Sequence, residues 1–282
     1  MPAGNLPQRE EYLRKRRNKR LLRYGIAFLI LAAIVAGLSY VSHLPKFTIS
    51  TIELHGGVLV REDDVARSAT QYLQGSYVWI FPVRNALWYP RKDLEKYLKE
   101  SFKRIDTIHA HLENSHTLII DITEKQPVAT WCGVAVPGSA AEDSMPQCYF
   151  MDENSIIFAP APNFSGDAYF TYYGPVEGDP VGQPYIASST EFEGLAQLVE
   201  TVRRLSLRPQ YLVAKGDGEY SLAIGGGAEI LFDTKEPLSE VIQNLEALLR
   251  NQIFSTSTSK DLPVDYIDLR FGNKLFYKLK GQ

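Results

Sequence analysis

The chain has few of the residues on which metal and redox chemistry depend, because its 282 residues include two cysteines and five histidines. It contains no Gly-x-Ser-x-Gly elbow and no His-Glu-x-x-His pair, so no motif indicates a hydrolase nucleophile or a zinc peptidase. His109, His111 and His116 cluster, but no cysteine or well-spaced acidic residue completes a zinc ligand set. We therefore expect no catalytic residues, no metal and no cofactor.

The chain also lacks a long low-complexity tract and an even distribution of charge. With 45% hydrophobic residues, it can bury the cores of one or two domains. Its first 23 residues hold eight basic and two acidic residues, out of 30 basic and 33 acidic in all, which leaves 22 basic against 31 acidic residues after position 23. This acidic remainder would repel phosphates and argues against a nucleic-acid partner.

Charge is absent from residues 24–42, which are mostly apolar. A helix over them spans about 28 Å, close to the thickness of the hydrocarbon core of a bilayer. Only Ser39, Ser42 and the tyrosines interrupt the apolar surface, whereas a buried helix of a soluble protein normally shows a polar stripe. We expect a transmembrane helix over residues 24–43. A cleaved signal peptide is the alternative, but its apolar region is normally shorter and ends in a small-x-small site.

The basic segment before this span predicts its orientation, because positively charged flanks stay in the cytoplasm. We expect a single-pass type II protein of the cytoplasmic (inner) membrane, with its N-terminus inside and its other domains outside. Beside a membrane span, the run KRRNKR is explained as a topology signal and not as a nucleic-acid patch.

Alternation and helical spacing predict the elements that follow. The first group has the order strand, helix, helix, strand, strand, at residues 47–54, 61–73, after Pro90, 107–112 and 117–123. Beyond residue 126 strands are predicted at 130–134, 147–151, 155–158, 211–215, 220–224, 229–232, 264–271 and 274–280, and helices at 191–207 and 237–252. The glycines at 225–227 lack the Lys and Ser/Thr of a phosphate loop and indicate a turn, as do Gly272 and Asn273. The expected fold class is α+β.

The two cysteines fall in the predicted hairpin of residues 130–134 and 147–151. Outside the membrane, Cys132 and Cys148 would form a disulfide if the strand register brings them face to face. Two small buried apolar residues are the other outcome. A metal site on this pair lacks two further ligands.

Three segments together resemble the POTRA module of the bacterial division proteins FtsQ and DivIB. They are FTISTIELHGG at 47–57, REDDVARSA at 61–69 and IDTIHAHLENSHTLIIDITEKQPVATW at 105–131. The last contains the pattern T-L-x-I-x-I-x-E-x-x-P-V-A-x-W. The loop at 76–91 is longer and more aromatic than the family pattern, and Gly56-Gly57 stands where the family usually has Gly-Asn.

The C-terminal segment YIDLRFGNKLFYKL resembles the closing hairpin of the FtsQ/DivIB β domain. Asp268, Leu269 and Arg270 match the family's Asp-Leu-Arg-Tyr motif, whereas Phe271 replaces the tyrosine and Leu279 stands where many members have tryptophan. The resemblance implies a basic cytoplasmic tail at 1–23, a transmembrane helix at 24–43, a POTRA domain at 47–125 and an FtsQ-type β domain at 126–282.

The function that the resemblance implies is a non-enzymatic scaffold of the septal division machinery. It would hold FtsB, and through it FtsL, by adding a partner strand to the C-terminal edge. Alternation puts Leu275, Tyr277 and Leu279 on one face, and Arg270 is a candidate donor to a partner carboxylate. The expected partner-binding residues are Arg270, Phe271, Lys274, Leu275, Phe276, Tyr277, Lys278 and Leu279.

Two alternatives stay open at this point. The C-terminal strand can simply be the last strand of a sheet with its apolar side chains buried. The POTRA-like module can also belong to an export or envelope-biogenesis chaperone, for which a transmembrane barrel is expected to follow. Further division proteins that bind the POTRA face, and the lipid bilayer itself, complete the set of expected partners.

Overall fold

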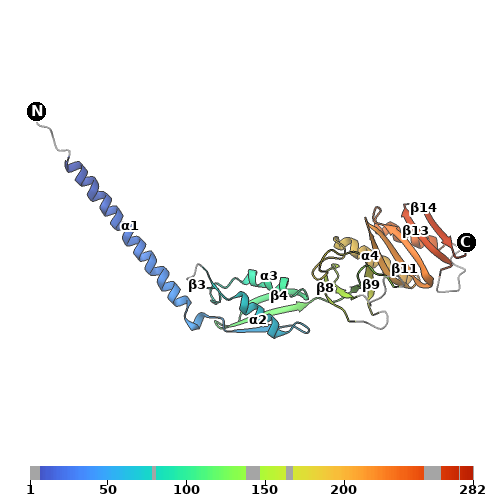
Figure 1. Ribbon diagram of the computed structural model, residues 1–282, viewed down its shortest axis with the longest axis horizontal. Helices are drawn as coiled ribbons and strands as arrows, with labels where there is room; N and C mark the ends of the chain where they lie inside the picture. Colours follow the sequence, from blue (N-terminus) through green and yellow to red (C-terminus); the bar gives the residue numbers. More distant parts are fainter. Residues whose placement is uncertain are drawn as a thin grey trace, which may run out of the picture. The chain divides into compact units, whose positions relative to one another are not determined.

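The computed structural model describes residues 7–77, 81–137, 147–162, 168–250, 262–272 and 274–281. The chain divides into two compact units, Met1–Glu124 and Lys125–Gln282 (Figure 1). The expected fold class is confirmed in its coarse form, because the chain is mixed α+β with an apolar N-terminal helix and a mixed β-sheet.

The N-terminal helix α1 runs from Pro7 to Ser42, so the basic segment is helical as well as the apolar one. Within it, Arg16–Ser42 is long and apolar enough to cross a membrane. Its 27 residues extend about 40 Å, more than the roughly 30 Å of a bilayer's hydrocarbon core. Its apolar side chains do not pack inside the protein, since Phe28 is 70% and Leu29 67% exposed. The uncharged part of this helix, residues 24–42, exposes apolar side chains, which is typical of a membrane-spanning segment.

The rest of the first unit is a three-stranded sheet with order β1-β5-β4, in which β1 is parallel and β4 antiparallel to β5. The expected order of strand, helix, helix, strand, strand is present, with an extra short ribbon, β2-β3, between the helices. The elements are η1 Pro45–Phe47, β1 Thr51–His55, α2 Glu62–Tyr72, β2 Ser76–Tyr77, β3 Phe81–Pro82, α3 Arg91–Ser101, β4 Ile105–Leu112 and β5 Thr117–Glu124.

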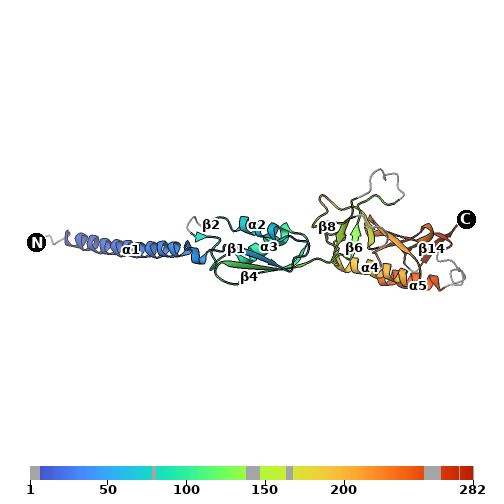
Figure 2. The ribbon, with the colours of Figure 1, turned by 90° about the horizontal axis from the view of Figure 1, so that it is seen from below.

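Both helices cover the same face of this sheet (Figure 2). The helical spacing of Val65 and Ala69 in α2, and of Leu94 and Leu98 in α3, turns one apolar side of each helix into a core shared with the sheet, with α2 against β1 and α3 against β4. Tyr72 and Tyr97 stack between the helices with ring centroids 4.7 Å apart. Burying one such aliphatic side chain stabilises the fold by about 1.5–3 kcal/mol, so this small core is the main source of stability of the sheet and its two helices.

The second unit is built on a nine-stranded sheet with order β14-β13-β12-β11-β10-β9-β6-β7-β8. Its elements are β6 Ala129–Trp131, β7 Tyr149–Met151, β8 Ile157–Pro160, β9 Phe170–Tyr173, α4 Ser189–Arg204, β10 Pro209–Gly216, β11 Glu219–Ile224, η2 Gly225–Gly227, β12 Ala228–Asp233, α5 Leu238–Leu249, β13 Val264–Phe271 and β14 Lys274–Leu279.

Two crossover connections explain why α4 and α5 lie side by side on one face of this sheet (Figure 2). Helix α4 joins the parallel strands β9 and β10, and α5 joins the parallel strands β12 and β13. Both crossovers move along the sheet in the same direction, and their shared right-handedness puts both helices on the same side. Gly194 lets them approach closely, since a Cβ there would lie 2.7 Å from Leu238 Cδ1.

Several predicted boundaries are wrong in detail. The first strand begins at Thr51 and not at residue 47, because Pro45–Phe47 forms a 3-10 turn and Thr48 pairs with Asn85 outside the sheet. The strand expected at 130–134 is β6, which begins one residue earlier and ends three residues earlier, and the strand expected at 155–158 is β8, displaced by two residues. The turn expected at Gly272 and Asn273 falls partly outside the described residues.

Candidate functional site: the open edge of the nine-stranded sheet

Strand β14 is the last strand at one end of the nine-stranded sheet. It pairs with β13 in antiparallel register, with Ile267 opposite Tyr277 and Asp268 opposite Phe276. Among the described residues, no strand pairs with its other side, and Figure 1 shows it beside β13 near the C-terminus. Alternate N–H and C=O groups of an edge strand point away from the sheet. β14 therefore offers about 20 Å of backbone to a further strand.

The inner side of the C-terminal hairpin is fixed to the unit. Leu275 and Leu279 pack against the core, whereas Tyr277, which was predicted on the same face, is exposed and does not belong to it. From α5, Asn244 Nδ2 donates a hydrogen bond of 3.1 Å to the carbonyl oxygen of Gly272 at the hairpin end. At the other end of β14, Lys280 N donates to Pro263 O at 3.0 Å. The open edge is therefore held in place before any partner arrives.

The outer surface of the hairpin carries an exposed aromatic pair. Phe271 is 54% and Phe276 51% exposed, and their rings meet edge to face with centroids 5.2 Å apart. Tyr277 is 37% exposed as well, but alternation puts it on the opposite face of β14, with Leu275 and Leu279. Exposed neighbouring aromatic side chains are typical of surfaces that bind other molecules.

Arg270 is already engaged inside the chain. Its Nε and Nη2 donate to the two carboxylate oxygens of Asp268 at 2.9 and 2.7 Å, and its Nη1 donates to Glu219 Oε2 at 3.2 Å. These hydrogen bonds hold the pKa of Asp268 below its usual value and raise the pKa of Arg270. A partner carboxylate would have to compete with Asp268 or Glu219, so the guanidinium orients the end of β13 in the unbound chain.

The lysines of β14 differ in how they are used. Lys278 Nζ lies 2.9 Å from Asp265 Oδ2 across the hairpin, and the hydrogen bond to Asp265 raises the pKa of Lys278. Both side chains are nearly half exposed, so this pair adds little stability. Lys274 is exposed and has no ion-pair partner among the described residues. It is the cation of this edge that is available to an acidic group.

The opposite end of the sheet is covered. There β8 receives a second backbone partner, because Ile157 N donates to Gln183 O at 2.9 Å and Gly182 N donates to Ile157 O at 2.6 Å. Ile156 also bridges to Pro184, and β8 ends at Pro160, which has no N–H. Phe158, near the middle of β8, is only 2% exposed. A further strand cannot add here without displacing residues 182–184.

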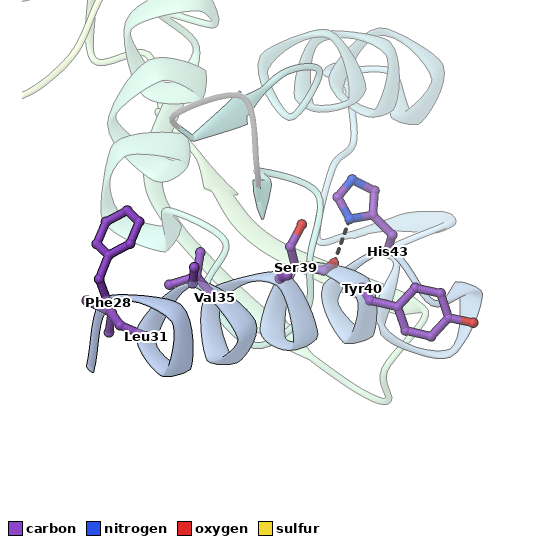
Figure 3. A pocket seen from close by; sticks show the side chains of 8 residues that line it. Phe28, Leu31, Val35, Ser39, Tyr40 and His43 are labelled. Atoms are coloured by element: carbon purple, nitrogen blue, oxygen red, sulfur yellow. Dashed lines mark hydrogen bonds between the residues drawn. The ribbon is translucent and has the colours of Figure 1, made fainter. Parts of the chain in front are cut away.

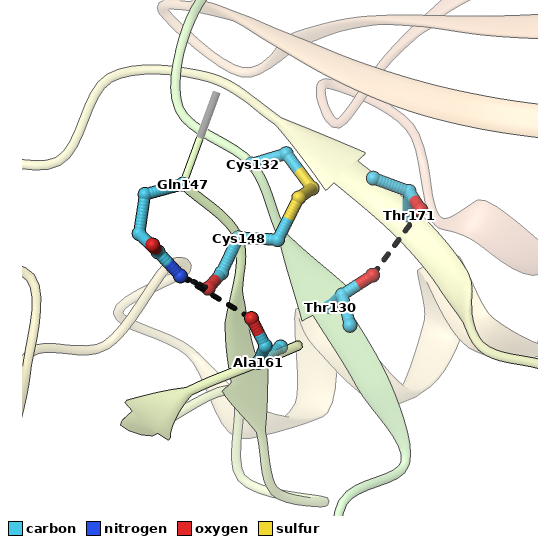
Figure 4. The surroundings of a disulfide bond; sticks show 6 residues. All are labelled: Thr130, Cys132, Gln147, Cys148, Ala161 and Thr171. Atoms are coloured by element: carbon cyan, nitrogen blue, oxygen red, sulfur yellow. Dashed lines mark hydrogen bonds between the residues drawn. A yellow bond between two sulfur atoms is a disulfide. The ribbon is translucent and has the colours of Figure 1, made fainter. Parts of the chain in front are cut away.

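A disulfide joins Cys132 to Cys148 near this covered end (Figure 4). β6 and β7 pair with Trp131 opposite Tyr149, and one further step of that register puts the two cysteines opposite each other. Neither cysteine lies within a strand, although both were expected to, because β6 ends one residue before Cys132 and β7 begins one residue after Cys148. Their Cα atoms are 4.2 Å apart. The bond joins the two strands at the loop end of the β6-β7 hairpin, directly after β6 and directly before β7.

Two of the three clustered histidines, His109 and His111, contact an arginine and an aspartate. Arg91 Nη2 lies 2.8 Å from His109 Nε2, and His111 Nδ1 lies 3.1 Å from Asp121 Oδ2. Within the described ranges, no group of three or more His, Cys, Asp or Glu residues is placed to hold a metal ion. The expectations of no metal, no cofactor and no catalysis stay predictions.

Glu124, the glutamate of the pattern that carries the POTRA resemblance, has a structural role. Its Oε1 accepts hydrogen bonds from the backbone amides of Val58, Leu59 and Val60 at 2.7, 2.7 and 2.9 Å. Burial alone would raise the pKa of Glu124, but these three hydrogen bonds hold it below its usual value. The carboxylate therefore fastens the segment after β1 to the end of β5.

Comparison with known proteins adds no relative: no protein-family model matches the chain, and no curated protein sequence matches it. The family expected from the POTRA-like segments and the C-terminal hairpin stays a prediction. Sequence reasoning named the residues of β14, but it missed the Asp268 carboxylate that binds Arg270 and the segment that covers β8. Asp268 lies two residues from Arg270 on the same strand, and that spacing was the available signal.

Proposed function

We propose that the chain is a membrane-anchored, non-enzymatic scaffold of the FtsQ/DivIB kind. In this proposal β14 binds a strand of a small single-pass division protein of the FtsB type, and FtsL joins through that protein. The observation that carries the proposal is the contrast between the open edge at β14 and the covered edge at β8. An edge strand with free N–H and C=O groups is the surface on which strand addition takes place.

Backbone pairing alone is too weak to hold such a partner. About five hydrogen bonds at about 1 kcal/mol net each are offset by association costs of at least about 4 kcal/mol. Side chains must supply the rest. Phe271 and Phe276 are exposed beside the edge and can bury an apolar partner side chain, while Lys274 can pair with a partner carboxylate.

Membrane anchoring favours the same interaction. In the proposed orientation the basic N-terminal segment is cytoplasmic, α1 crosses the inner membrane, and the chain after α1 lies outside the cytoplasm. A partner that is itself anchored in the same bilayer meets β14 at a raised effective concentration, so a weak strand pairing suffices. The proposed role is to bring such partners together at the division septum.

The test uses the full-length chain co-expressed with the FtsB-type and FtsL-type proteins of its own genome. Phe276→Glu puts a charge on the exposed face of β14, and Val128→Glu is the matched control, because Val128 is 49% and Phe276 51% exposed in the same unit. Loss of about 1.5–3 kcal/mol of apolar contact predicts at least a tenfold weaker complex for Phe276→Glu. Val128→Glu is expected to bind like the wild type. Equal binding by all three chains would contradict the proposal.

A further inference from the structure

The outer end of α1 is fastened to the loop formed by residues 81–90, called here the tether loop. Asn85 is fully buried, and its Nδ2 donates a hydrogen bond of 2.8 Å to the carbonyl oxygen of Ser42, the last residue of α1. Two backbone hydrogen bonds reinforce this contact, from Ala86 N to Phe47 O at 2.8 Å and from Ile49 N to Arg84 O at 3.0 Å. The tether loop is therefore fixed where the membrane-spanning segment ends.

Two large apolar side chains of the tether loop point to solvent. Leu87 is 59% and Trp88 43% exposed, and neither belongs to the core of the unit. Their backbone is ordered by Asn85, since Leu87 N donates to Asn85 Oδ1 at 2.9 Å and Trp88 N donates to Asn85 O at 3.3 Å. The Trp88 ring also meets Phe81 edge to face, with centroids 6.0 Å apart. Leu87 and Trp88 are thus held in an ordered backbone but are not buried in the core, so burying them against another apolar phase would be favourable.

The helix end beside this loop already has the character of a membrane boundary. Tyr40 is 73% exposed and projects away from the helix, whereas His43 turns back so that its Nδ1 lies 2.7 Å from Ser39 O (Figure 3). Tyrosine and tryptophan are enriched where the hydrocarbon core gives way to the headgroups. An aliphatic and aromatic stripe continues from Tyr40 down the helix through Val35 and Leu31.

We propose that Leu87 and Trp88 insert into the interfacial region of the same bilayer that α1 crosses, and so dock the first unit onto the membrane surface. Leu87 and Trp88 are two and three residues from Asn85, so the chain keeps them within roughly 10 Å of the residue that binds the helix end. The interfacial region extends about 5–8 Å beyond each side of the hydrocarbon core. The occupant is the bilayer, because Asn85, which orders Leu87 and Trp88, is hydrogen-bonded to the last residue of the membrane-spanning helix. The inference does not depend on strand addition at β14.

A second exposed apolar pair in the same unit provides the control. Val58 and Leu59 are 86% and 66% exposed, but they are fastened to Glu124 at the far end of β5. The near end of β5 adjoins the segment that leaves α1, where Ser50 N donates to His116 O at 2.8 Å. The eight residues of β5 put about 23 Å between the two ends. A docked tether loop leaves Leu59 in water.

The experiment places one dye-labelled cysteine in the full-length chain, as Leu87→Cys or as Leu59→Cys. The two native cysteines are joined in a disulfide, so the new thiol is the one that reacts with an environment-sensitive fluorophore. Both replaced leucines are exposed, so both variants should fold. The labelled chains are reconstituted into vesicles of phosphatidylethanolamine and phosphatidylglycerol, and quenching by nitroxide lipids is compared with quenching by aqueous iodide.

We expect the label at position 87 to emit at shorter wavelength and to be quenched several-fold more by nitroxide lipids than the label at position 59. Trp88→Ser in the Leu87→Cys chain should reduce that difference. If both labels are quenched equally by iodide and by neither lipid, the proposal is overturned and the exposed pair is left as a surface for a protein. Failure of the chain to insert into the vesicles also overturns it, because the docking rests on an anchored α1.

Discussion

The two ends of the nine-stranded sheet meet the same physical problem in opposite ways. At β8 the outward backbone groups of Ile157 are paired with Gly182 and Gln183, the strand stops at a proline, and Phe158 is buried. At β14 the strand is longer and carries exposed aromatic and basic side chains. Edge strands promote unwanted pairing unless they are shortened, covered or charged. Among the described residues, the β14 edge is protected only by its lysines, without a covering segment, and this is the edge at which we propose that a partner strand pairs.

The largest expected difference between the two ends comes from removing the same side chain at each. Phe158→Ala in β8 empties a fully enclosed site and should lower the free energy of unfolding by about 3–5 kcal/mol. Phe276→Ala in β14 removes a ring that is half exposed and should cost about 1 kcal/mol or less. Denaturant titration of both variants measures the contrast. Similar losses would mean that the β14 ring is part of a core.

Opening the disulfide should loosen one end of the sheet and spare the other. Replacing both Cys132 and Cys148 by serine removes a cross-link over a sequence separation of 16 and should cost about 3 kcal/mol. Hydrogen exchange should accelerate in β6 and β7 and stay unchanged in β14. Faster exchange in β14 as well would show that the two ends unfold as one unit.

The Asp268–Arg270 pair should make the open end sensitive to acid. Asp268→Asn removes charged hydrogen bonds in a carboxyl group that is 9% exposed, so we expect a loss of about 2 kcal/mol at neutral pH. Because Arg270 lowers the folded-state pKa of Asp268, its contribution is present above the usual carboxyl pKa and fades as the pH falls through the lowered value. The difference between wild type and variant, measured by thermal unfolding, should therefore shrink in acid. A difference that stays constant down to the acid transition would contradict this account.

The smallest expected effect is electrostatic. Lys274→Glu reverses the one cation of β14 that lacks an ion-pair partner among the described residues. It should slow association with an acidic partner strand a few-fold at low salt and leave stability within about 0.5 kcal/mol. Stopped-flow association rates at two salt concentrations measure it, with Lys235→Glu, remote in sequence from the edge, as the control.

Local periodicity predicted much of the fold but not the order of the strands. Leu94 and Leu98 in α3, and the alternation of β13, are strong local signals, and both elements are present. Strand β9 was missed because its residues, FTYY, show no alternation of polar and apolar types. The sheet order depends on pairings between distant segments, which no short-range pattern encodes.

The candidate site was predictable in part for the same reason. The inward placement of Leu275 and Leu279 follows from alternation. The segment that covers β8 is bound through backbone groups of Gly182 and Gln183. Backbone hydrogen bonds do not depend on side-chain type, so the sequence could not predict this contact. The same holds for the contact between Asn85 and the end of α1, because a single buried asparagine in an aromatic loop gives no sign of its partner.

Hydrogen exchange at both edges, with and without the FtsB-type partner, tests the central claim most directly. The account predicts that partner binding slows exchange of the alternate outward amides of β14, residues 274–279, and leaves those of β8, residues 157–160, unchanged. A bound partner that leaves β14 exchange as fast as before, or that protects β8 instead, would contradict it.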